Sequence, residues 1–139
     1  MIHEPLSKHL RANAGVAALI GAGTNARYFE GTLGQKAPGG KDRIPAVLLR
    51  SVDINDRQVA YCGTVGTIRA LALIDCYDAA ARDAWRVAAA VRGALLDFRG
   101  VMSGTLQVRI ITLELETELD DPDPGLYRVR QNWAVWFTE

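Results

Sequence analysis

The sequence is poor in the features that mark several common protein classes. Its 139 residues include two cysteines and two histidines, and 16 Lys and Arg balance 16 Asp and Glu, so the net charge is zero. We interpret Cys62 and Cys76 as buried thiols of a chain that folds without disulfides or metal. The charge balance removes any bulk attraction to nucleic acid or to an anionic membrane. No apolar run is long enough to cross a bilayer, and the opening MIHEPLSKHL does not resemble a secretory signal, so we expect a chain that stays in the cytosol where it is made.

Catalytic and cofactor motifs are also lacking. Residues 21–26 (GAGTNA) fit the loose dinucleotide pattern G-x-G-x-x-A, but a helix pattern precedes them and glycines and a proline follow, which is the reverse of the strand-then-helix order that the pattern requires. His3 and His9 have no cysteine or carboxylate cluster beside them. The serines at 7, 51 and 103 lie in no nucleophile-elbow pattern. The sequence therefore predicts a protein that is not an enzyme and that needs no cofactor or metal.

The strongest pattern is a strand followed by a long helix. Residues 67–76 (TIRALALIDC) are apolar on both faces, as in a strand at the centre of a sheet. Residues 79–98 carry apolar side chains at three- and four-residue steps, which predicts an amphipathic helix. We expect Asp78 to cap the start of this helix and Gly100 to follow its end. The helix would lie back across the sheet.

The remaining segments complete a predicted α+β domain over residues 1–139. We expect a first helix at 5–20, and strands at 26–30, 45–53, 106–117 and 126–138, with a hairpin over 54–63 that turns at Asn55-Asp56. A loop over 31–43 holds four glycines, and a turn follows the long helix at 101–104. The predicted fold is a mainly antiparallel sheet of about five strands, with the long helix packed on one face and an N-terminal helix beside it.

The predicted strand 106–117 contains a switch of parity. Its apolar residues run Leu106, Val108 and Ile110, and then Ile111, Leu113 and Leu115. Because a strand presents one face at every second residue, the switch predicts either a bulge near Ile110 or a strand that leaves its own sheet to pack on a neighbouring subunit.

Six carboxylates occur within ten residues at the end of this strand. They are Glu114, Glu116, Glu118, Asp120, Asp121 and Asp123. Clustered carboxylates can bind hard cations, but no calcium-loop spacing is present, and we favour a solvated hairpin tip over 114–125. A surface that meets a cationic partner or lines a channel is the alternative. The loop cations Lys36, Lys41 and Arg43 could likewise contact phosphates or form a solvated rim.

Several local strings, in their order and spacing, resemble the tail completion, or tail terminator, family of long-tailed bacteriophages. They are ALIG at 18–21, RYF at 27–29, AP at 37–38, IPAV at 44–47, the block 75–96, and the acidic turn with LYR and the closing strand at 120–137. None of them is a catalytic signature. The resemblance covers most of the chain, from about residue 10 to residue 137.

The resemblance implies a structural virion protein of a phage or prophage. Such a protein forms a ring, commonly a homohexamer, at the head-proximal end of the tail tube, ends tube polymerisation and joins the tail to the head connector, after assembly in the host cytoplasm. Its partners would be copies of itself, the tube protein and the connector or stopper protein, while DNA passes through the lumen without specific binding. A different neck or connector protein, or a small-molecule-binding α+β domain, is the alternative.

The resemblance also suggests uses for the unexplained residues. Ile111, Leu113 and Leu115 would form a subunit contact where the strand crosses to a neighbour, and Lys36, Lys41 and Arg43 would reach the tube or connector. The carboxylates at 114, 116, 118, 120, 121 and 123 would line the lumen and repel DNA.

Overall fold

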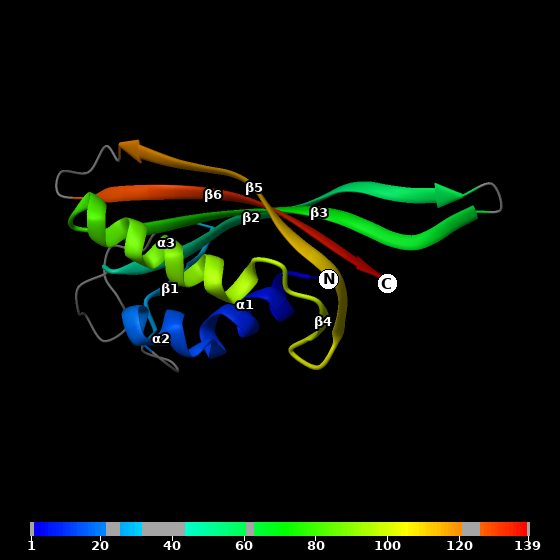
Figure 1. The fold of residues 1–139 in the computed structure, drawn as a ribbon, viewed down its shortest axis with the longest axis horizontal. Coiled ribbons are helices and arrows are strands. Elements are labelled where there is room, and N and C mark those ends of the chain that lie inside the picture. The colour runs from blue at the N-terminus through cyan, green and yellow to red at the C-terminus, as the bar shows by residue number, and fades with distance from the viewer. Residues whose placement is uncertain (1, 22–25, 32–43, 61–62, 121–125, 139) are drawn as a thin grey trace.

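The computed structural model describes residues 2–21, 26–31, 44–60, 63–120 and 126–138, with only the backbone at 54–60, 63–66 and 120. Three helices lie together on one side of a six-stranded sheet that curls along its length (Figure 1). The predicted loop over 31–43 and the turn at 121–125 lie outside the described residues. The α+β class predicted from the sequence is therefore confirmed.

The predicted first helix is two helices. α1 spans His3–Ala12 and α2 spans Ala14–Ile20. The chain breaks at Asn13, whose extended backbone ends α1 and whose side-chain oxygen accepts a hydrogen bond from the Val16 N–H at 3.1 Å. Asn favours such cap positions because its oxygen satisfies a free N–H of the first turn. The spacing of apolar residues continues across Asn13, so the spacing alone predicts one helix where the structure has two.

The long helix α3 spans Ala81–Leu95 and buries one stripe of small and branched residues. That face consists of Ala84, Val87, Ala88, Val91, Ala94 and Leu95. Asp78 does not cap the helix as expected: the N-cap is Ala80, and Asp78 ends a strand and accepts a hydrogen bond from the Ala79 N–H. Asp97, at a φ of 60°, provides the left-handed residue after the helix, and Gly100, at 115°, begins the next strand.

The sheet has six strands rather than about five, and it is mixed: mainly antiparallel, with one parallel pair. In chain order they are β1 (Tyr28–Glu30), β2 (Ala46–Ala60), β3 (Gly63–Asp78), β4 (Gly100–Met102), β5 (Leu106–Asp120) and β6 (Tyr127–Thr138). Their order across the sheet is β1-β2-β3-β6-β5-β4, in which only the short edge strand β1 runs parallel to its neighbour β2. β4 occupies part of the segment predicted to be a turn. The predicted hairpin turn at Asn55-Asp56 is wrong, because β2 continues to Ala60.

β3 is central, as predicted, and its first residues pair only with β2. Its pairing with β6 begins at Thr67, so the end of the β2–β3 hairpin projects beyond the rest of the sheet as a two-stranded ribbon (Figure 1). The parity switch in β5 is a bulge, as one of the two predictions had it: the register with β6 shifts between Val108 and Ile110. A second bulge occurs between Leu113 and Leu115.

The core lies between the helices and one face of the sheet. Alternate residues of β3 and β6 are buried there, including Ile68, Ile74, Val129 and Trp133. The Trp133 indole donates to the buried Gln131, whose amide donates in turn to the Ala88 carbonyl on α3, so these polar groups are satisfied. The three helices cover this face of the sheet, and Ala46, Leu48 and Tyr77 are buried in a second, smaller cluster at one end of the other face. The site described next lies on that other face (Figure 1).

Candidate functional site

The face of the sheet opposite the helices, called the open face here, mixes apolar and charged side chains. The register places Leu71 and Leu73 of β3, Asn132 and Trp136 of β6, and Leu115 of β5 on it. Leu71, Leu73, Asn132 and Trp136 are half-buried, and Leu115 is 54% exposed. The sequence predicted β3 to be buried on both faces, but the open face is only partly covered within this chain.

A buried carboxylate holds a cluster of arginines at one end of the open face. Asp75 in β3 is fully buried and accepts hydrogen bonds from Arg50 Nε at 2.8 Å and from Arg130 Nε at 2.9 Å. A second Arg130 bond, from Nη2, measures 3.2 Å, and Arg128 Nη1 lies 3.8 Å from the same carboxylate. Arg50 also donates to the Tyr77 hydroxyl at 3.3 Å. One carboxylate in β3 thus binds side chains from β2 and β6 and links three strands.

The Asp75 cluster keeps its arginines charged. The hydrogen bond to Asp75 raises the pKa of Arg130. Burial alone would lower the pKa of Arg50, but the hydrogen bond and the charge of Asp75 outweigh burial and raise it. Among the described side chains of this cluster, three arginines surround one carboxylate, so the cluster carries a net positive charge. We did not predict this cluster from the sequence. Two features could have indicated it: a charged Asp75 inside the apolar run 67–76, and two arginines on the same face of a strand, at 128 and 130.

A second ion pair lies farther along the open face. Arg69 Nη2 of β3 donates to Glu114 of β5 at 3.0 Å, and its guanidinium carbon lies 5.7 Å from the centre of the Trp136 ring. Glu114 occupies the second bulge of β5, and Arg50 occupies a bulge of β2. Because a bulge re-aims the extra residue, both ion pairs depend on interruptions of the strand register.

A hollow of about 300 Å³ opens on this face beside the Arg69–Glu114 pair. Leu71, Leu73 and Asn132 line it together with Ser51, Asp53, Arg69, Ala72 and Glu114. The Asn132 side-chain oxygen is buried and has no hydrogen-bond partner among the described residues. An apolar floor with a polar rim suits an inserted side chain from another protein.

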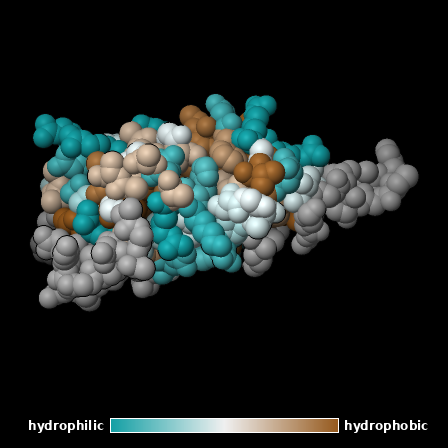
Figure 2. All heavy atoms as spheres, turned by 90° about the horizontal axis from the view of Figure 1, so that it is seen from below, coloured by the Kyte–Doolittle hydropathy of each residue, from teal (hydrophilic) through white to brown (hydrophobic). Residues whose placement is uncertain are grey.

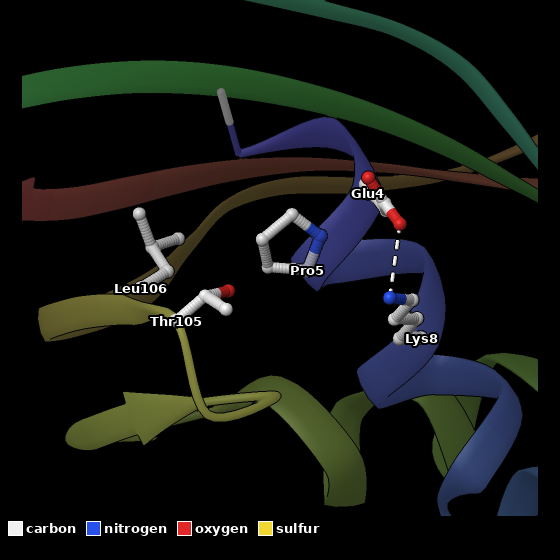
Figure 3. A pocket seen from close by; sticks show the side chains of 5 residues that line it. All are labelled: Glu4, Pro5, Lys8, Thr105 and Leu106. Carbon is white, nitrogen blue, oxygen red and sulfur yellow. Dashed lines mark ion pairs between the residues drawn. The ribbon is translucent and has the colours of Figure 1, made fainter.

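A second hollow, of about 320 Å³, lies between α1 and the turn into β5 (Figure 3). Pro5, Thr105 and Leu106 line it, with the exposed Glu4–Lys8 ion pair at its edge (Figure 3). The hydrogen bond from Lys8 lowers the pKa of Glu4. The five lining side chains include no nucleophile paired with a base, so this hollow offers no evident chemistry.

The residues predicted to form a subunit contact are divided between the core and the surface. Ile111 is fully buried under the helices, because the bulge before it turns its side chain to the core face, and it is not available to a neighbour in this conformation. Leu113 is half-buried against the same core, and Leu115 is exposed on the open face. Lys36, Lys41 and Arg43 lie outside the described residues.

The predicted acidic tip is largely strand, and its glutamates have partners. Glu114 pairs with Arg69, while Glu116 pairs with Arg92 of α3 and accepts a hydrogen bond of 2.6 Å from Gln131. Glu118 accepts from the Trp85 indole at 3.0 Å and is exposed. The side chains of Asp120, Asp121 and Asp123 are not among those described.

The described residues contain no cluster of His, Cys, Asp and Glu that could hold a metal ion, and among them no helix is long and apolar enough to cross a membrane. Cys76 is buried, as predicted, and burial raises the pKa of its thiol. Cys62 lies outside the described residues.

Residues 4–138 match the family described as tail completion protein gp17. The chain belongs to this family. The match confirms the resemblance noted in the sequence and identifies a structural protein of a phage tail. The fold is similar to that of a chain in the structure described as the virion of a native gene transfer agent (GTA) particle, with a TM-score of 0.71 and 20% identity over 96% of this chain and 92% of the other. No curated protein matches the sequence.

Membership of the tail completion family supports a structural role in the phage tail for this chain.

Proposed function

We propose that this tail completion protein forms a closed ring, expected to be a homohexamer, at the head-proximal end of the tail tube. There it ends tube polymerisation and provides the surface for joining the tail to the head connector. The family match supports this proposal most directly. A sheet with helices on one face only supports it as well, because the open face exposes apolar and charged side chains that a neighbouring subunit can bury.

The proposal gives two charged segments separate uses. The loop cations Lys36, Lys41 and Arg43 would contact the tube or the connector, and the carboxylates from Glu118 to Asp123 would face the lumen. Glu114 and Glu116 are neutralised by arginines, so Glu118 and the aspartates that follow would supply most of the repulsion toward DNA. Replacing the three loop cations by Ala should abolish head joining and leave the ring intact.

The test is the mass of the chain in solution by light scattering across a concentration series, with negative-stain images and an assay for capping of tail-tube ends. A closed ring that caps tubes supports the proposal. A chain that stays monomeric and leaves tube growth unchanged would overturn it and favour a different neck protein. A saturable rise in melting temperature with a small ligand would instead favour the binding-domain alternative.

A further inference from the structure

The three most exposed apolar side chains among the described residues lie in two separate places. Leu96 and Val101, at 48% and 56% exposed, flank the connection from α3 into β4, which we call the β4 corner (residues 96–101). Leu115, at 54%, lies on the open face beside the hollow floored by Leu71 and Leu73; we call these three residues with Asp53 the open-face patch. Figure 2 shows the helix side, where apolar residues occur in separate areas among hydrophilic ones; the open face is on the far side of this view.

One chain cannot bring its own two patches together. Leu73 and Leu115 both pair across from Asn132, whereas Val101 pairs with Gln107, which lies opposite Thr138. Six residues of β6 separate these two rows, which is roughly 20 Å of strand. In addition, β4 and the adjoining part of β5 curl toward the side on which the helices lie (Figure 1). Each patch therefore needs a partner outside the chain.

The charges on the two patches are complementary. Asp53 lies on the rim of the hollow and is exposed, and Arg99 is exposed in the β4 corner. Within the described part of the chain, neither of them forms an ion pair or hydrogen bond through its side chain. The open-face patch therefore has an apolar floor and a carboxylate, Asp53, at its rim. The β4 corner is apolar and carries a guanidinium, Arg99, so the two surfaces are complementary in both respects.

We propose that the β4 corner of one subunit docks into the open-face patch of the next. Val101 and Leu96 cover Leu71, Leu73 and Leu115, and Arg99 reaches Asp53. This assignment rests on the proposed ring, because two different patches on one chain make a head-to-tail contact of the kind that closes into a ring. The occupant of the open face is thus a second copy of the chain.

The first experiment uses single substitutions at exposed positions, so that folding is kept. Val101→Asp disrupts only the β4 corner, and Leu115→Asp disrupts only the open-face patch. Each variant should remain a folded monomer even at about 100 times the concentration at which the wild type is half assembled. Leu96→Asp, which lies outside any strand, checks the corner independently. Tyr127→Asp is the matched control, because Tyr127 is 41% exposed but belongs to neither patch, and it should assemble normally.

Mixing the two defective variants separates this contact from other arrangements. Val101→Asp keeps an intact open face and Leu115→Asp keeps an intact corner, so an equimolar mixture should give a dimer with one copy of each and no ring. A mixture that stays monomeric, or variants that still form the wild-type ring, would overturn the assignment while leaving the proposed ring standing. A wild type that neither assembles nor caps tubes would instead overturn the proposed function.

Charge exchange tests the Arg99–Asp53 contact. Asp53→Arg and Arg99→Asp should each weaken assembly about tenfold, because each places like charges together. The double variant exchanges the two charges across the contact and should restore the wild-type assembly midpoint. If the double variant is weaker than either single variant, the two residues do not meet.

Discussion

Replacing the buried Asp75 with Asn should destabilise the fold more than neutralising a carboxylate in a surface ion pair. Asn has nearly the shape of Asp, so the change removes the charge and little packing. Asp75 is fully buried, and its partners Arg50 and Arg130 are left with side chains 34% and 29% exposed and no neutralising charge. The effect therefore measures how strongly one carboxylate holds three strands together.

The magnitude follows from the burial of the partners. Removing one member of a fully buried ion pair costs about 3–5 kcal/mol, because the other charge is stranded. Here the arginines can turn toward water, which reduces the penalty, so we expect a loss of about 2–3 kcal/mol in the free energy of unfolding. For a chain of this size that lowers Tm by roughly 6–10 °C.

Urea unfolding followed by tryptophan fluorescence measures the loss, at a concentration where wild type and variant are both monomeric, since assembly would add to the apparent stability. Asp83→Asn is the matched control: Asp83 lies 3.7 Å from Arg86, with side chains 33% and 62% exposed, and its loss should cost under about 0.5 kcal/mol. If Asp75→Asn costs no more than this control, the cluster is an ordinary surface pair and the reasoning fails.

Three further predictions concern single groups. Asn13→Ala should cost about 1 kcal/mol in urea unfolding by leaving the Val16 N–H without its acceptor, whereas Asn13→Asp should not. Burial raises the pKa of Tyr28 from 10 to about 12, so its contribution to stability is complete below pH 10 and is lost as the pH rises toward 12; Tyr28→Phe should flatten this alkaline decline in Tm. In a Cys62→Ser background, Cys76 should react with a thiol reagent only at the rate of unfolding, and fast labelling of the folded chain would contradict its burial.

Local periodicity was sufficient to predict the elements whose faces are strongly amphipathic. The apolar run 67–76 predicted a central strand, and the three- and four-residue spacing after it predicted the helix α3. Both patterns can be seen in the sequence because both elements bury apolar side chains against one core. The break at Asn13 was missed because a cap interrupts the backbone without interrupting the apolar stripe. β4 was missed because three residues are too few to show any period.

The open face could not be predicted in the same way. Arg50 and Asp75 are 25 residues apart, and Asp75 and Arg130 are 55 apart, so their meeting depends on strand order and on a bulge at Arg50. A bulge reverses which face the following side chains occupy, and one undetected shift changes every later assignment. In β5 the sequence showed the bulge near Ile110 but gave no sign of the one at Glu114, which creates the Arg69 pair.

The edge of β5 that faces away from β6 is poorly suited to pairing with a strand of another copy. Subunit contacts are therefore expected through the faces of the sheet. β4 pairs with β5 only from Leu106 to Val108, and along the rest of β5 no described strand covers that edge. Two bulges and three glutamates lie along it, and both features oppose the addition of a strand from another copy. Docking a corner on a face is a head-to-tail contact, and such a contact gives a ring of a set number of subunits when its rotation closes. An edge unsuited to strand pairing, beside a partly covered face, therefore agrees with subunit contacts made through faces rather than through strands.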